Sequence, residues 1–262
     1  MDKSAPVPKN GESWTAAVLV IGDEILSGRT QDTNINYIAR FLAARGIDLK
    51  EARLVGDAAG EIAAALNALR AAYDFVFTTG GIGPTHDDIT ADAVAAAFEV
   101  GIGYHPEAYA LLEARYGRED FNPMRRRMAR APDGAVLIPN SVSAAPGFQI
   151  GNVFVLAGIP AIARAMLEAL APRLPQGAPL HAVTIAGEVA EGAVAEGLAA
   201  IQKAHPATAI GSYPYYRGDG GYGVHLVARG RDAAAVEAAA RAIEALLKEL
   251  GATAARIAQP GG

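Results

Sequence analysis

Residues 78–88 bring glycines, hydroxyls and carboxylates together in the order Thr-Thr-Gly-Gly-Ile-Gly-Pro-Thr-His-Asp-Asp. They follow the apolar run 75–77 and precede a helical pattern that begins near Thr90, which predicts a strand, a glycine turn and a helix. Glycines permit positive φ and close approach of a ligand, and a backbone nest at a helix N-terminus binds anions, usually phosphate. Carboxylates disfavour a bare anion, so a metal ion or substrate hydroxyls would account for Asp87 and Asp88 at such a site.

Plainer interpretations of this stretch stay open. A glycine turn between a strand and a helix is common, and early helical carboxylates can simply complement the helix dipole. The stretch lacks the Gly-Lys-Ser/Thr of a Walker loop and the third glycine of the dinucleotide fingerprint. His86 is interpreted as a surface histidine, and Asp57 could cap a helix. The second acidic turn, at Asp23-Glu24, favours a ligand site.

Two further polar turns follow apolar strands earlier in the chain. The run 16–21 ends at Gly22, and the predicted strand 49–55 ends at Gly56-Asp57. Amphipathic helices are predicted between the strands, the first from about Asp32 or Thr33 to Gly46. This β-α-β-α-β-α order indicates a parallel sheet covered on both faces, with ligands bound beyond the carboxyl ends of its strands. The acidic residues of all three turns should therefore converge at one edge; they are Asp23, Glu24, Asp57, Asp87 and Asp88.

The remaining chain predicts a second, smaller unit. Residues 105–131 are predicted to be helical, and their arginine cluster at 125–130 is either a solvated face or a contact for substrate phosphates. Strands at 135–138 and 153–157 flank a loop, and Gly158 opens a helix. We predict a disordered tail at 1–13, an α/β/α domain at 14–172, a linker at 173–179 and a small α+β domain at 180–252.

Composition excludes several classes of protein. The absence of cysteine excludes disulfides, thiolate metal sites and cysteine nucleophiles. No apolar run approaches the ~18 residues that span a bilayer, and no signal peptide precedes the first strand, so a cytoplasmic protein without a membrane partner is expected. A net charge of −5 without a dense basic stripe argues against nucleic acid as a partner.

Four motifs together resemble the amino-terminal domain of competence/damage-inducible protein A, in the molybdopterin-binding superfamily. That superfamily includes the molybdopterin adenylyltransferases and the pterin-binding domain of eukaryotic FAD synthase. The resemblance covers about residues 14–172, the small unit resembles the family's additional domain, and a short form without the deamidase domain is expected. The motifs are Gly22-Asp23-Glu24-Ile25-Leu26-Ser27-Gly28, Asp32-Thr33-Asn34, Thr78 to Thr90, and Ala145-Pro146-Gly147-Phe148.

The resemblance implies a three-layer α/β/α fold and a pterin or nucleotide site at the polar turns. Asp57 and Asp88 match the acidic pair that looks catalytic in the adenylyltransferases, and Asp88 is the expected ligand of a divalent cation, Mg or Co. Some relatives are pyrophosphatases acting on ADP-ribose or FAD, and relatives self-associate, so a homodimer or trimer is expected. The implied ligand-binding residues are Gly22, Asp23, Glu24, Ser27, Gly28, Asp32, Asn34, Thr79, Gly80, Gly81, Gly83, Pro84, Thr85, Asp87, Pro146 and Gly147.

The chain departs from the family pattern around the second half of the expected site. An acidic residue of the family is replaced by Ile162, and the other departures are Arg125, Met128, Ser143, Ala144 and Ala157. Metal-dependent phosphoanhydride chemistry beside AMP, of the ADP-ribose or FAD pyrophosphatase type, is the leading hypothesis. The alternatives are a non-catalytic pterin or nucleotide module and a molybdopterin adenylyltransferase-like enzyme of molybdenum cofactor biosynthesis.

Overall fold

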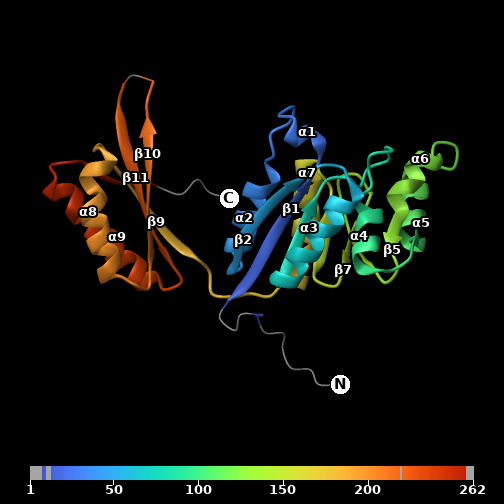
Figure 1. Ribbon diagram of the computed structural model, residues 1–262, viewed down its shortest axis with the longest axis horizontal. Helices are drawn as coiled ribbons and strands as arrows, with labels where there is room; N and C mark the ends of the chain where they lie inside the picture. The colour runs from blue at the N-terminus through green and yellow to red at the C-terminus, as the bar shows by residue number, and fades with distance from the viewer. Residues whose placement is uncertain (1–7, 10–12, 219, 258–262) are drawn as a thin grey trace. The chain divides into compact units, whose positions relative to one another are not determined.

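A computed structural model of the chain describes residues 8–9, 13–218 and 220–257, which divide into two compact units (Figure 1). The first unit is Met1–Gly177 and the second is Ala178–Gly262. Most of the predicted disordered tail, 1–13, lies outside the described residues. Within it, Lys9 donates from its backbone to Asp74 Oδ1 at 2.7 Å.

The first unit contains one large sheet in the order β2-β1-β3-β8-β7-β6 and a two-stranded β4-β5 sheet. Its strands are β1 (Trp14–Ile21), β2 (Ile47–Val55), β3 (Phe75–Thr79), β4 (Ile102–Tyr104), β5 (Arg130–Pro132), β6 (Val136–Ile138), β7 (Gly147–Ile150) and β8 (Val153–Leu156). Its helices are α1 (Asp23–Leu26), α2 (Asn34–Ala43), α3 (Ala59–Ala72), α4 (Thr90–Phe98), α5 (Pro106–Tyr116), α6 (Pro123–Arg126) and α7 (Pro160–Leu170), with 3-10 turns η1 (Arg127–Ala129) and η2 (Ala171–Arg173).

Three layers explain the continuous apolar sequence of the central strands. The four strands β2, β1, β3 and β8 run parallel, and β7 and β6 add antiparallel pairs at one side. Alternate residues of β1 enter different cores: Leu19 packs with α3 and α4, whereas Val18 packs with α2 and α7. Because helices cover both faces, both sets of side chains must be apolar. The predicted three-layer, mostly parallel α/β/α fold is confirmed.

A side layer extends from α4 and carries the predicted arginine cluster. Strand β5 pairs antiparallel with β4, and a small core of Ala108, Leu112, Phe121 and Ala129 joins α5 to η1. Asn122 begins α6 by accepting a hydrogen bond from the Arg125 amide at 3.0 Å. The arginines therefore lie on a short helix, a 3-10 turn and a strand, not on one long helix face.

The second unit is an antiparallel sheet with two helices, which confirms the predicted small α+β domain. Its elements are β9 (His181–Gly187), α8 (Glu191–Ala204), β10 (Ala209–Tyr216), β11 (Tyr222–Gly230), α9 (Ala233–Glu249) and β12 (Ala254–Ile257), with the strand order β10-β11-β9-β12. Ile185, Leu226 and Ile243 are buried in its core. No helix in the described part of the chain has both the length and the apolar character to cross a membrane.

Several elements differ from those predicted from sequence. Strands β4 and β5 were not predicted, and β5 begins within the range 105–131 that was expected to be helical. Strand β7 occupies the end of the predicted loop 139–148, because Phe148 and Ile150 pair with β8 and enter the core. The first polar turn contains the four-residue helix α1. Strand β12 was not predicted, because its short run of alanines gains strand geometry only by pairing with β9.

Candidate functional site

The glycine turn after β3 fits too closely against its neighbours to accept side chains. A Cβ on Gly80, whose φ is +103°, would lie 2.1 Å from the carbonyl oxygen of Ile21. A Cβ on Gly81 would lie 2.2 Å from the Thr90 Oγ1 atom. That hydroxyl donates to the Gly80 carbonyl at 2.9 Å, and the Thr90 amide donates to the Gly81 carbonyl at 3.0 Å. The start of α4 therefore fixes the turn, whose backbone lines a cleft.

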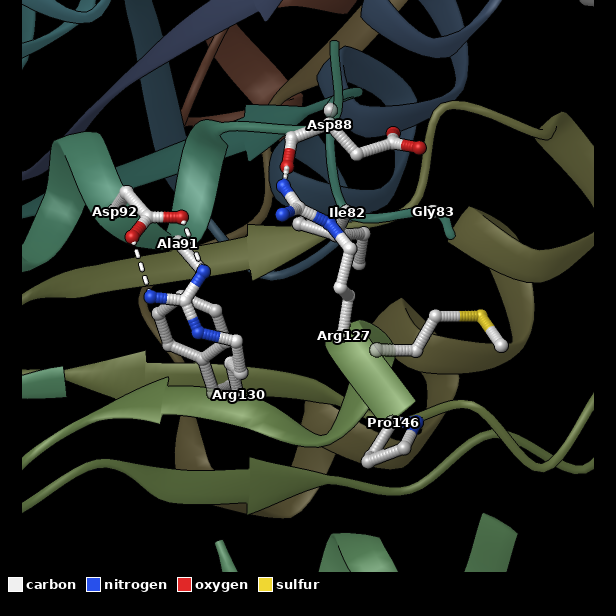
Figure 2. A pocket seen from close by; sticks show the side chains of 11 residues that line it. Ile82, Gly83, Asp88, Ala91, Asp92, Arg127, Arg130 and Pro146 are labelled. Atoms are coloured by element: carbon white, nitrogen blue, oxygen red, sulfur yellow. Dashed lines mark hydrogen bonds and ion pairs between the residues drawn. The ribbon is translucent and has the colours of Figure 1, made fainter. Parts of the chain in front are cut away.

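Asp88 is held at this turn with part of its carboxylate available. Its Oδ2 atom accepts hydrogen bonds from the Thr85 amide at 2.7 Å and the Thr85 hydroxyl at 2.6 Å. Arg127 donates from Nη2 to the Asp88 carbonyl at 3.1 Å, as Figure 2 shows. Among the residues that the structure describes, Oδ1 has no hydrogen-bond partner. Asp88 is thus oriented through one oxygen and its backbone while the second oxygen remains an acceptor.

A cleft of about 560 Å³ lies beside the turn. Its lining combines the glycine backbone and charged side chains such as Glu24 and Asp88 with a larger number of apolar residues. A cleft of this size and composition suits a small organic ligand with a charged group. The lining residues are Glu24, Thr30, Gly80, Gly81, Ile82, Gly83, Pro84, Asp88, Tyr116, Arg125, Met128, Ser143, Ala145, Ala157, Gly158, Ile159, Pro160 and Ile162.

Three members of the arginine cluster line the clefts around Asp88, and the fourth, Arg126, does not. Arg125 lines the large cleft, lies 4.5 Å from the centre of the Tyr116 ring, and donates to the Asp120 carbonyl at 2.7 Å. Arg127 and Arg130 line a smaller pocket around Asp88 (Figure 2). Arg130 is occupied by a two-hydrogen-bond ion pair with Asp92, at 2.7 and 2.9 Å.

Asp23 and Asp57 join two turns at the same sheet edge. Asp57 Oδ2 accepts from the Asp23 amide at 3.0 Å, and the Asp57 amide donates to Asp23 Oδ1 at 3.4 Å. A Cβ on Gly56 would lie 2.5 Å from that same oxygen. Neither aspartate is among the residues lining the clefts around Asp88. The predicted convergence of the turns thus occurs, but Asp57 is engaged at the start of α1.

A third, small pocket of about 60 Å³ is lined by the residues of the Asp-Thr-Asn motif, Asp32 to Asn34. Asp32 Oδ1 accepts from the Ile35 amide at 2.9 Å, and Asn34 Nδ2 donates to the Gly158 carbonyl at 2.8 Å. The motif therefore ties the start of α2 to the segment before α7. Glu24, Asp32, Asn34 and Thr79, all predicted from sequence, line this pocket together.

The remaining predicted residues lie in varied positions. Gly22 is buried beside α1, where a Cβ would meet the Glu24 carboxylate at 2.5 Å. Pro146 lines the pocket that Arg127 and Arg130 also line (Figure 2). Gly147 is buried in β7. The other four are exposed; they are Ser27, Gly28, Thr85 and Asp87.

Sequence reasoning missed part of the lining of the cleft. Thr30, Tyr116 and the Gly158–Pro160 segment line it without having been proposed as ligand-binding. One signal was available, because Gly158 follows buried strand β8 and precedes α7, the same strand-turn-helix arrangement as the predicted turns. Tyr116 offered no signal, since its position depends on how α5 folds over the cleft.

These features define a class: a three-layer α/β/α ligand-binding domain with its cleft at the carboxyl edge of a parallel sheet. The family described as "Probable molybdopterin binding domain" matches residues 17–176. The chain belongs to that family, and it is CinA-like. The family described as "FAD synthase, middle domain" matches residues 179–255, within the second unit. The resemblance inferred from the sequence motifs is confirmed.

Individual relatives match different shares of the chain. A CinA-like protein of Desulfosudis oleivorans is 37% identical over 159 residues, 58% of this chain and 38% of the relative. The chain thus spans well under half of that relative's length. An Archaeoglobus fulgidus protein is 32% identical over 232 residues, 88% of this chain and 97% of its own. The crystal structure of CinA from Thermoplasma acidophilum matches with 33% identity and a TM-score of 0.59, covering 62% of this chain and 98% of that one.

Proposed function

We propose that the first unit binds a nucleotide and hydrolyses a phosphoanhydride beside AMP, with ADP-ribose or FAD as the class of substrate. The observation that supports this most directly is the available Asp88 oxygen beside the tightly packed glycine turn in one cleft. Phosphate oxygens need hydrogen-bond donors, such as the backbone N–H groups of a glycine turn. A carboxylate can lie beside a phosphate only when a positive charge between them offsets their repulsion. The glycine turn and the Asp88 carboxylate together therefore favour a phosphate and a divalent cation bound at the same time.

The cleft offers a different environment to each part of such a substrate. Gly80, Gly81 and Gly83 line the cleft, so a diphosphate could contact their backbone there. Met128, Ile159 and Ile162 provide an apolar wall for a planar ring. Arg125, stacked on Tyr116, adds a positive charge to the same cleft.

A divalent cation fits this site as one shared between protein and substrate. The described residues include no group of three or more His, Cys, Asp or Glu arranged to hold a metal ion. Magnesium is commonly bound by one or two carboxylates together with substrate phosphates, and Asp88 Oδ1 has the required chemistry. When bound, such an ion would neutralise charge that develops on the phosphate oxygens.

The protein's own contribution to this reaction is chiefly positioning. The Thr85 contacts fix the Asp88 carboxylate, and Arg127 fixes its backbone. Holding the anhydride against a rigid turn lowers the entropic cost of attack. Water adds across the anhydride, the P–O bond to the bridging oxygen breaks, and AMP and the second phosphate monoester leave with release of a proton.

A second candidate is a non-catalytic module for molybdopterin or a nucleotide. It is favoured by the engagement of Asp57 with Asp23, which leaves Asp88 as the member of the expected acidic pair that lines the cleft. The family description, a probable molybdopterin binding domain, also supports a pterin ligand. A molybdopterin adenylyltransferase-like enzyme would use the same anhydride chemistry in the synthetic direction. Self-association and a cytoplasmic location stay predictions.

The test is incubation of the full chain with ADP-ribose, FAD, and ATP plus molybdopterin, in magnesium, cobalt or EDTA, with chromatographic separation of products. We expect release of AMP from ADP-ribose or FAD that EDTA stops. Asp88→Asn should lower kcat at least 100-fold because it removes the negative charge from the one available oxygen. Glu61→Gln, an exposed charge change on α3, is the control and should retain full turnover.

Each outcome separates the candidates. Tight retention of molybdopterin or nucleotide without turnover in any metal would establish the binding module and refute the hydrolase. Consumption of ATP with formation of an adenylylated pterin would establish the transferase. Equal turnover by Asp88→Asn and wild type, with both proteins folded by circular dichroism, would remove Asp88 from the mechanism.

A further inference from the structure

The small pocket beside the main cleft contains a buried hydroxyl without a partner. Thr79 ends β3, the strand between β1 and β8, and is 1% exposed. Within the described chain, its Oγ1 atom is fully buried and makes no hydrogen bond. Leaving a hydroxyl buried and unsatisfied is unfavourable, because it loses its hydrogen bonds to water without replacement. Thr79 lines the small pocket, so a bound group could supply the missing partner.

Strand alternation places this hydroxyl on the pocket side of the sheet. Phe77, two residues earlier, packs in the core formed with α2 and α7, and Val20 of β1 belongs to the same core. Side chains two residues apart lie on one face of a strand, so Thr79 faces the α2 and α7 layer. The pocket lies on that face, lined also by Val20, the start of α2 and Pro160 of α7.

The charged groups of the pocket are two carboxylates, Asp32 and Glu24, which can only accept hydrogen bonds. Thr30, Gln31 and Thr33 also line it and can both donate and accept. Asp32 uses only Oδ1, for the Ile35 amide, which leaves Oδ2 without a described partner. Glu24 lines the pocket, and neither of its carboxylate oxygens has a partner among the described residues. Asn34 commits its amide nitrogen to Gly158 and keeps its oxygen as an acceptor. A phosphate would be repelled here, whereas a group that brings several hydrogen-bond donors would be favoured.

The position of the pocket identifies the donor group. The pocket shares Glu24, Thr30, Gly80, Gly158 and Pro160 with the main cleft, so a group in it must be joined closely to one at the glycine turn. Its volume of about 60 Å³ admits hydroxyl groups but not an aromatic ring system. Carboxylates bind the hydroxyls of ribose in other nucleotide sites by accepting hydrogen bonds.

We propose that this pocket binds the ribose diol of the nucleotide, with Asp32 and Glu24 accepting from the 2′ and 3′ hydroxyls and Thr79 pairing with one of them. The assignment rests on the proposed nucleotide function and makes it more specific. It selects a ribonucleotide over a deoxyribonucleotide and over a free pterin, which has no ribose.

The ligand arm of the test compares AMP with 2′-deoxy-AMP and 3′-deoxy-AMP by titration calorimetry on the full chain. Losing a hydroxyl that donates to a carboxylate should weaken binding at least tenfold. Asp32→Asn should weaken AMP binding by a similar factor while α2 stays capped, because asparagine caps helices as well as aspartate does. The variant should then lose discrimination against one of the two deoxynucleotides, the one lacking the hydroxyl that Asp32 binds, and keep it against the other, whose missing hydroxyl is bound by Glu24.

The protein arm uses two threonines from the same strand. Thr79→Val should weaken AMP binding about fivefold and yet raise the Tm of the ligand-free chain, because it removes an unsatisfied hydroxyl. Thr78→Val is the matched control: its hydroxyl is also buried without a described partner, but Thr78 does not line the pocket. It should raise the Tm similarly and leave AMP affinity unchanged.

The outcomes distinguish this assignment from the proposed function. If the deoxynucleotides bind as tightly as AMP, or if Thr79→Val and Thr78→Val bind AMP equally, the ribose assignment is wrong while nucleotide hydrolysis stands. Absence of measurable AMP binding also overturns the ribose assignment. It refutes the proposed function only if ADP-ribose and FAD also remain intact in the hydrolysis assay.

Discussion

The two units use their polar side chains in opposite ways. In the first unit, oxygens of Glu24, Asp32 and Asp88 remain available at one sheet edge, within the part of the chain described. In the second unit, polar groups stabilise the structure: Arg256 bonds both Glu237 and Glu244 across β12 and α9. The available oxygens of the first unit line clefts at one sheet edge, where a ligand could use them.

Sheet topology explains why the available groups collect in the first unit. Parallel strands deliver their following turns to the same edge, so the turns after β1, β2, β3 and β8 all meet there. Antiparallel strands distribute successive turns to both edges, as β10 and β11 do. The following predictions test two points. The first is whether close packing at the carboxyl edge of the first unit's sheet supports the site, and the second is whether ion pairs and helix packing stabilise the second unit.

The largest expected change is the loss of stability from Gly80→Ala. A Cβ would lie 2.1 Å from the Ile21 carbonyl at a φ of +103°, so the free energy of unfolding should fall by about 3 kcal/mol or more. Urea unfolding followed by the fluorescence of Trp14, the chain's single tryptophan, reports the first unit. Gly134→Ala, also at positive φ but with open space around it, should lose only ~1 kcal/mol. Similar losses would mean that the conformation, not close packing, requires Gly80.

Next in size is the effect of Arg127→Gln on turnover. The substitution removes the hydrogen bond to the Asp88 carbonyl, so kcat should fall about tenfold, with a smaller change in KM. Arg126→Gln is the matched control, since Arg126 donates to the Phe121 carbonyl and does not line the clefts. Equal effects of the two variants in the ADP-ribose assay would show that Arg127 has no special role in positioning Asp88.

A smaller, stabilising change is expected in the second unit from Gly192→Ala. Gly192 lies in α8 with nothing within 4 Å of a Cβ, so alanine should add roughly 0.5 kcal/mol by reducing the entropy of the unfolded chain. Hydrogen exchange of α8 peptides in the full chain measures it. Gly197→Ala should not stabilise, because its Cβ would lie 2.4 Å from Leu246 of α9. Faster hydrogen exchange of α8 in Gly192→Ala than in the wild type would contradict the open space around Gly192.

The smallest expected effect is the pH dependence of the Arg256 ion pairs. Hydrogen bonding from Arg256 lowers the pKa of Glu237. A lowered pKa in the folded state contributes stability above the unfolded value, about 4.3, and loses it as pH falls through the folded value. Arg256→Gln should therefore lower the Tm slightly at pH 7, with a difference that shrinks below pH ~4.3. A constant difference across this range would exclude the ion pairs as its source.

Prediction from sequence succeeded where a pattern is local. The run 16–21 predicted β1, and three turns with acidic residues predicted a shared edge, because parallel topology follows from alternating strands and helices. It did not predict β12 or the full extent of β7, which depend on partners distant in sequence. The sequence pattern predicted one helix for the arginine cluster, whereas its members are distributed over α6, η1 and β5.

The sequence alone indicated the family, through motifs that resemble it, and also a parallel sheet covered on both faces and the position of the glycine turn, because strand, helix and glycine patterns are local. The tertiary structure decided which acids remain available. Asp57 and Asp88 follow their strands alike, yet Asp57 bonds the Asp23 amide while Asp88 keeps one oxygen at the cleft. Likewise, Thr78 and Thr79 are chemically identical neighbours, and only the sheet's two faces distinguish them, since side chains alternate along a strand.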